Sequence, residues 1–296
     1  MSWREAMLGA FLATIGRGRW WLLALAGFLV RGGILLLLPP VVIPPTPADL
    51  ALISSPALLG AGLQSPTPLF VTVIVVVILG LTAVLLGSGL LGAWLDTALI
   101  EAAARDDELE GLAATGPIPI NAGLTLRLVA HIPTFVAVGL GYFALGDAAY
   151  AELSSPQPGL PLVVRILLRA PLATGAIVVA WLAGEAWGGL AVRRLGRHGS
   201  MRAALVGGLR DLLRPPAVVT LVVTNLVVGL LVVALWLAAG RAFDRLWPLL
   251  VDGAPAGTLL VALGLLVATW AAGLWLLAIG LAWRSAAWTA EALRRG

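Results

Sequence analysis

The sequence predicts an all-α polytopic membrane protein, a bundle of six transmembrane helices with amphipathic helices in the membrane interface. Hydrophobic residues make up 60% of the chain and charged residues 11%, against about 45–50% and 25% in soluble domains. A transmembrane helix needs roughly 20 predominantly apolar residues, and six runs reach or approach that length. The six runs are Trp20–Leu38, Leu69–Leu95, Leu124–Leu145, Leu162–Leu190, Ala217–Ala239 and Thr258–Trp283.

The polar segments between these runs are too short to fold as separate domains. The two longest, 39–68 and 96–123, have about 30 residues each, and units below about 40 residues usually need disulfides or metals. Cysteine is absent, which excludes disulfides and thiolate chemistry. We therefore expect a single membrane domain over residues 1–296.

The elements follow in order from the N-terminus. Residues 1–19 are predicted to hold an interfacial helix, because apolar side chains recur at helical spacing after Ser2, which can cap its start. The first run is predicted to be an uncleaved span, since it is too long for a signal peptide and contains Arg31. The helix of the second run is expected to continue through residues 96–110.

Three further segments are predicted to lie on the membrane surface. Residues 48–63, within the proline-rich segment 39–68, and residues 241–251 are interpreted as short helices on the outer face. Residues 201–213 are predicted to form a basic amphipathic helix on the inner leaflet, capped by Ser200. Its candidate contacts to anionic lipids are Arg202, Arg210 and Arg214.

The arginines predict how the chain is oriented. All 19 basic residues are arginine, and most of them fall on one side if the N-terminus is placed in the cytoplasm. Positively charged residues favour the cytoplasmic side of bacterial membrane proteins. We therefore expect a multi-pass protein of the bacterial inner membrane with both termini in the cytoplasm.

Polar side chains inside apolar runs are expensive to insert and usually face the bundle interior. Glu185 is expected to pair with Arg127 or His131, because a short loop joins the third and fourth runs and makes them antiparallel neighbours. Arg31 is a competing partner that we expect nearer the outer half. The candidate intramembrane cluster consists of Asp96, Arg127, His131 and Glu185. The other intramembrane polar residues are Arg31, Arg169 and Asn225.

Two interpretations of these polar residues stay open. They can form internal ion pairs that hold the bundle together, or a relay for protons or substrate. A repeated pattern, Arg127-x3-His131-x-Pro133 and Arg165-x3-Arg169-x-Pro171, has the same ambiguity. Its basic residues share a helix face, where they can bind an anion or lipid phosphate, or extend from the end of a span to the interface.

No catalytic motif is complete. Gly87-Ser88-Gly89 lacks the earlier glycine of rhomboid-type proteases, and Glu101-x3-Arg105 has one of the two glutamates of CAAX-type proteases. With two histidines and no cysteine, we expect no structural metal site. We therefore predict that the protein is not an enzyme and needs no cofactor.

A basic segment before the fifth run carries a resemblance. It reads Val192-Arg193-Arg194, then Ser200-Met201-Arg202-Ala203-Ala204-Leu205, then Gly208-Leu209-Arg210. With the six-span layout and the acidic, alanine-rich helix after the second span, it resembles a loose group of bacterial integral membrane proteins. The group includes the membrane domain fused to some glycerophosphodiester phosphodiesterases. The resemblance covers roughly residues 82–296 and implies a helical membrane domain without known catalytic residues.

These observations predict a non-catalytic, membrane-embedded interaction or assembly component. Its expected partners are the bilayer, anionic lipids of the inner leaflet, and another membrane protein or a second copy of the chain. The alternative is a small transporter or a lipid-handling permease. Nucleic acid is not an expected partner, because the arginines lie beside membrane spans.

Overall fold

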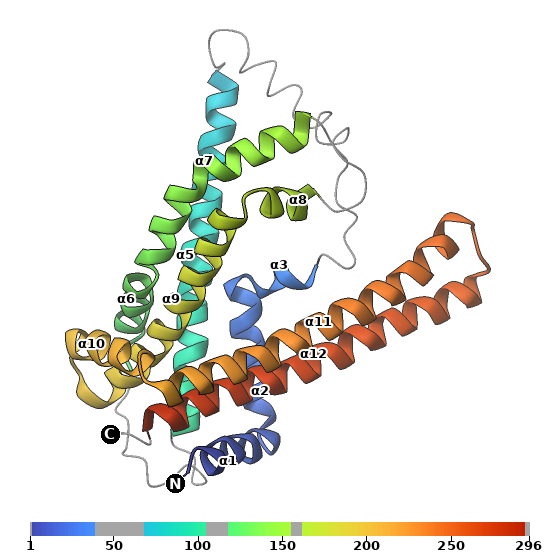
Figure 1. The fold of residues 1–296 in the computed structure, drawn as a ribbon. Helices are drawn as coiled ribbons and strands as arrows, with labels where there is room; N and C mark the ends of the chain where they lie inside the picture. The colour runs from blue at the N-terminus through green and yellow to red at the C-terminus, as the bar shows by residue number, and fades with distance from the viewer. Residues whose placement is uncertain (1, 39–67, 105–117, 155–161, 294–296) are drawn as a thin grey trace. The chain divides into compact units, whose positions relative to one another are not determined.

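The computed structural model describes residues 2–38, 68–104, 118–154 and 162–293, and these ranges contain helices and no strand (Figure 1). The predicted surface helix at 48–63 and the helical extension at 105–110 lie outside the described residues. The helices are α1 (Trp3–Ile15), α2 (Gly18–Phe28), η1 (Leu29–Gly33), α3 (Ile34–Leu37), α5 (Pro68–Ala104), α6 (Ile120–Ala130), α7 (Ile132–Ser154), α8 (Leu162–Arg169), α9 (Pro171–His198), α10 (Met201–Leu212), α11 (Pro215–Val251) and α12 (Ala256–Leu293).

Four helices of the described ranges are long and apolar enough to cross a membrane. They lie within the third to sixth predicted runs and their extensions, which supports a helical membrane protein. The four segments are Ile132–Glu152, Pro171–Gly196, Pro215–Val251 and Ala256–Ala292.

The chain divides into two compact units. Unit 1 consists of residues 1–42, 90–131 and 183–296, and unit 2 consists of residues 43–89 and 132–182. α5 and α9 each contribute one part to each unit. The two units are described in turn.

Unit 1 begins with the predicted N-terminal helix α1. The Glu5 amide donates to Ser2 Oγ and the Ser2 amide donates to the Glu5 carboxylate, so the two residues form a capping box. The bond from the Ser2 amide lowers the pKa of Glu5 below its usual value. Small residues at 6, 10 and 13 are buried, and the Trp283 indole of α12 donates to Met7 O at 3.3 Å. α1 thus packs on α12 with its alanine face.

The first predicted span is not a regular helix, which corrects the sequence prediction. α2 passes into one turn of π-helix, η1, before α3. Gly32 within η1 has φ +95°, a conformation that glycine adopts readily and other residues rarely do. Two adjacent glycines, Gly32 and Gly33, weaken the helix at this point.

Prolines divide two more predicted spans. α6 ends before His131 and α7 starts at Ile132, and α8 and α9 meet at Ala170. Pro133 and Pro171 stand in the first turn of α7 and α9, where a missing amide hydrogen is tolerated. The preceding helix cannot continue regularly through proline. The predicted runs at 124–145 and 162–190 are therefore two helices each.

α11 and α12 form a long antiparallel hairpin that closes through a turn at Gly253, with φ +69° (Figure 1). The predicted surface helix at 241–251 is wrong, because α11 continues through it to Val251. Glycines of α12 let α11 approach closely, since a Cβ at Gly280 would lie 2.6 Å from Leu231 Cδ1. Gly273, seven residues earlier, faces Leu235 in the same way.

In unit 2, α7 and α8 pack together through a buried carboxylate. Glu152 is 6% exposed, with Arg165 Nε at 2.9 Å and Arg169 Nη1 at 3.0 Å from its oxygens. The sequence analysis singled out Arg169 without a partner, and the structure supplies one in Glu152. On the facing part of α9, Ala173 and Ile177 lie close to Gly141.

Candidate functional site

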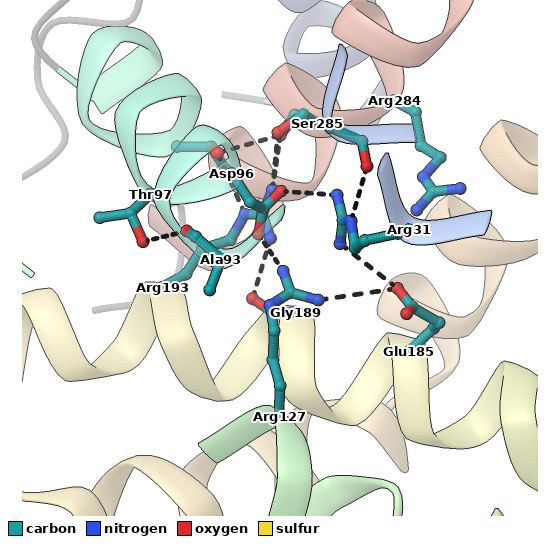
Figure 2. A network of polar contacts seen from close by, with 12 residues as sticks. Arg31, Ala93, Asp96, Thr97, Arg127, Glu185, Gly189, Arg193, Arg284 and Ser285 are labelled. Atoms are coloured by element: carbon teal, nitrogen blue, oxygen red, sulfur yellow. Dashed lines mark hydrogen bonds and ion pairs between the residues drawn. The ribbon is translucent and has the colours of Figure 1, made fainter. Parts of the chain in front are cut away.

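The candidate site is a group of charged side chains in unit 1, which we call the ionic cluster (Figure 2). It draws on η1, α5, α6, α9 and α12, and His131 follows α6 directly. Its members are Arg31, Asp96, Arg127, His131, Glu185, Arg193 and Arg284.

Two carboxylates organise the cluster. Asp96 contacts Arg127 directly and lies 3.5 Å from Arg31 Nη2. Glu185 lies 3.5 Å from His131 Nε2, 3.7 Å from Arg127 Nη1 and 3.9 Å from Arg31 Nη1. The predicted pairing of Glu185 with Arg127 or His131 is therefore present in the structure, with both residues.

Arg31, predicted as a competing partner of Glu185, is a member of the cluster as well. Helical side chains point back toward the N-terminus of their helix, and Arg31 Nε donates to Gly27 O at 3.1 Å. A Cβ at Gly92 of α5 would lie 2.6 Å from Arg31 Cγ. The absence of a side chain at Gly92 thus makes room for Arg31 against α5.

Glycines also bring α9 close to α6. A Cβ at Gly184 would lie 3.0 Å from Ala130 O, and a Cβ at Gly188 would lie 3.3 Å from Ala130 Cβ. The two glycines stand on either side of Glu185 in the sequence and form a small-residue face of α9 that carries this contact. The close approach places Glu185 near the basic residues at the end of α6.

His131 is held between two oxygen acceptors. Nδ1 lies 2.8 Å from Arg127 O, and Nε2 lies 3.5 Å from Glu185 Oε1. A neutral imidazole has one N–H donor and satisfies only one of these acceptors. The geometry therefore suits the doubly protonated ring, which adds positive charge to the cluster.

Arg193 is a cluster residue that sequence analysis treats only as an orientation signal. It is 4% exposed and donates to Gly189 O at 2.8 Å, Ser285 O at 3.1 Å, Ser285 Oγ at 3.0 Å and Thr289 Oγ1 at 3.1 Å. Four dipolar acceptors thus surround this charge. Arg193 follows Glu185 by eight residues, and residues at four-residue steps share one face of a helix. This spacing could have indicated that Arg193 lies on the same face as Glu185.

Arg284 is the second residue that sequence analysis leaves out of the site. Its Nη1 donates to Asn225 Oδ1 at 3.2 Å, and its guanidinium lies 4.8 Å from the Trp288 ring centroid. The amide nitrogen of Asn225 donates to Leu221 O at 2.7 Å, which fits an orientation with Oδ1 toward Arg284. Asn225, predicted as an isolated intramembrane polar residue, is thus a neighbour of the cluster.

Positive charge exceeds negative charge in the ionic cluster. Four arginines stand against the carboxylates of Asp96 and Glu185. Within the described ranges, no carboxylate oxygen lies at ion-pair distance from Arg193 or Arg284. The same ranges contain no group of three side chains placed to hold a metal ion.

The predicted lipid-binding helix is present as α10, and Ser200 Oγ caps it by accepting from the Ala203 amide at 3.5 Å. Arg202 and Arg210 are exposed. Arg214 is exposed as well but pairs with Asp211 at 3.2 Å, and Asp211 also binds Arg194. Two of the three predicted lipid contacts, Arg202 and Arg210, are therefore exposed without such an internal ion pair.

The chain matches no family model, no curated protein and no solved structure.

Proposed function

We propose that this chain is a six-span protein of the bacterial inner membrane with both termini in the cytoplasm. The six apolar runs and the unequal distribution of arginine support this topology. Periplasmic and cytoplasmic reporter fusions at Gly62 and His198 test it. Periplasmic activity at Gly62 and cytoplasmic activity at His198 are expected, and the reverse pattern would contradict the topology.

Within that membrane, we propose that the protein is a non-catalytic interaction or assembly component. One observation carries this proposal, an exposed stripe on α7 in which aromatic side chains alternate with glycine. Phe135 and Tyr142 are 61% and 68% exposed, and a Cβ at Gly139 or Gly146 would have no neighbour within 4 Å. These four residues recur at four- and three-residue steps, so they share one helix face.

Such a stripe suits contact with a helix of another membrane protein. Small residues let two helices approach within a bilayer, where apolar surface alone gives no preference over lipid. Separately, within unit 1, the side chains of the ionic cluster connect η1, α5, α6, α9 and α12.

Photo-crosslinking in intact cells tests this role. A photoreactive amino acid is placed at Tyr142, on the stripe, and at Val179, an exposed position on α9. One adduct of defined mass is expected from position 142 and none from position 179. Equal, diffuse labelling at both positions would show that the stripe contacts only lipid and would remove the support for an assembly role.

The alternative function, a lipid-handling permease, is favoured by a different observation. The ionic cluster has more arginines than carboxylates, and excess positive charge inside a membrane protein commonly marks the path or binding site of an anion. Reconstituted liposomes distinguish the two functions. Lipid transfer between leaflets that is lost with Arg284→Gln and retained with Arg241→Gln, an exposed arginine of α11, would favour the permease.

A further inference from the structure

We propose that the ionic cluster binds a phosphate-type oxyanion through Arg284 and Arg31. The anion is either the headgroup of an anionic lipid or a free phosphate, since both present the same tetrahedral oxygens. This site is separate from the exposed arginines of α10, and it does not depend on the assembly role.

The first argument is the number of free donors on Arg284. A guanidinium has five N–H groups, and Arg193 donates four hydrogen bonds to backbone and hydroxyl oxygens. Arg284 has one such acceptor among the described residues, Asn225 Oδ1. No nitrogen of Arg284 is among the buried atoms of the described residues that lack a partner, so its remaining N–H groups are accessible. Arg284 therefore has donors available for a ligand.

The second argument is charge. Arg31 and Arg127 share the carboxylates of Asp96 and Glu185, so no third carboxylate of the described ranges balances Arg284. A positive charge that no carboxylate balances attracts an anion. An oxyanion with one or two negative charges would reduce the excess of positive charge in the cluster.

The third argument is position. Figure 2 shows Arg284 and Arg31 on the same side of the cluster, with Glu185 below them. The Arg31 side chain is 26% exposed and that of Glu185 is 20% exposed, so this side is the accessible one. The opposite side is closed by Arg193, which is 4% exposed. The exposed parts of Arg31 and Glu185 thus lie on the same side of the cluster as Arg284.

The neighbours of Arg284 favour a planar, two-pronged contact. Trp288 lies against its guanidinium at 4.8 Å and is itself fixed by a bond from its indole nitrogen to Thr224 Oγ1 at 2.8 Å. A guanidinium held flat in this way presents parallel N–H groups. That arrangement matches two oxygens of a phosphate group and selects it over a monatomic anion such as chloride.

The binding experiment uses the full chain, purified in a neutral detergent. Thermal shift is measured against inorganic phosphate, with sodium chloride at the same ionic strength as the reference. In a parallel arm the protein is placed in phosphatidylcholine nanodiscs with and without phosphatidic acid, and bound lipid is counted by native mass spectrometry. Arg284→Gln removes the proposed contact, and Arg241→Gln, an exposed arginine of the same hairpin, is the matched control.

Wild type and Arg241→Gln are expected to bind, and Arg284→Gln to bind about 10- to 100-fold more weakly, the usual loss for a charge-assisted hydrogen bond. Arg284→Lys retains the positive charge but lacks the paired N–H groups of a guanidinium, so its affinity should lie between those of wild type and Arg284→Gln. It also serves as the test variant if Arg284→Gln folds poorly. Retention of phosphatidic acid alone identifies a lipid headgroup, and stabilisation by phosphate alone identifies a free oxyanion. Binding in neither arm, or binding unchanged in both Arg284 variants, would overturn the proposal.

Discussion

Removal of the Glu185 carboxylate should destabilise unit 1 by leaving positive charge uncompensated. Glu185 lies 3.5–3.9 Å from His131, Arg127 and Arg31. Loss of one member of a buried ion pair costs about 3–5 kcal/mol. The Glu185 side chain is 20% exposed, and water screens part of its charge. We therefore expect Glu185→Ala to lower the unfolding free energy by about 3 kcal/mol, the lower end of that range.

A double-mutant cycle in mixed micelles, followed by denaturant titration, measures the interaction itself. Arg127→Ala removes one of the positive charges that Glu185 compensates, so the double variant should lose less than the sum of the single variants, by at least about 0.5 kcal/mol. Glu185→Gln separates charge from packing, and exposed Asp244 is the control, with Asp244→Ala expected within about 0.5 kcal/mol of wild type. Additive losses, or a Glu185→Ala variant as stable as Asp244→Ala, would refute the reasoning.

Three further predictions concern other parts of unit 1. Gly184→Val should lower stability by about 1–3 kcal/mol through overpacking, whereas Gly175→Val, where a Cβ has no neighbour within 4 Å, should not; thermal melts in detergent compare them. Arg202→Gln should weaken binding to anionic vesicles about five-fold, which corresponds to about 1 kcal/mol per arginine. Arg214→Gln should weaken this binding less, and co-sedimentation with vesicles at low salt measures both effects. Because the pKa of Glu5 is lowered, its capping contribution is present above the unfolded pKa and is lost as pH falls through the folded pKa; amide exchange in α1 should accelerate in acid, and unchanged exchange would contradict this.

Much of the helical content was predictable because hydrophobic runs and caps are local signals. The apolar runs predict helices, and four of the observed helices are apolar and long enough to span a membrane. Ser200 predicts the start of α10, since a serine hydroxyl satisfies a free amide at a helix start. These features depend on a few neighbouring residues, so no tertiary information is needed to infer them.

The breaks and extensions were not predicted, because hydropathy does not distinguish a continuous helix from two consecutive ones. Pro133 and Pro171 lie inside apolar runs and divide them, although proline is tolerated in many membrane helices. In α11 the polar residues from Arg241 onward suggested a new element, but Leu246 is 5% exposed and packs as part of the same helix. Packing between α11 and α12, which is not visible in the sequence, sets the end of the hairpin.

Only part of the candidate site could be predicted, because contacts between distant helices are not visible in the sequence. Pairing of Glu185 with Arg127 and His131 follows from depth and adjacency, which the sequence indicates. Arg193 and Arg284 were assigned to orientation, because an arginine at the cytoplasmic end of a span usually has that role. A buried arginine has a structural role as well, since it needs acceptors within the protein, whereas an exposed arginine donates to water.

The contrast between these two arginines separates a structural role from a binding role. Arg193 is enclosed, and backbone and hydroxyl oxygens satisfy its donors, so its loss removes three hydrogen bonds that join α9 to α12. Arg284 donates to Asn225, and its charge adds to a cluster in which described arginines already outnumber carboxylates. Arg193→Gln should therefore destabilise the ligand-free protein, whereas Arg284→Gln should leave its stability near wild type. The two substitutions remove the same charge from the same unit, so opposite outcomes would trace to the acceptors around each guanidinium. Equal loss of stability would mean that Arg284 is also a structural residue, and the phosphate affinity of Arg284→Lys would then decide whether it has a binding role.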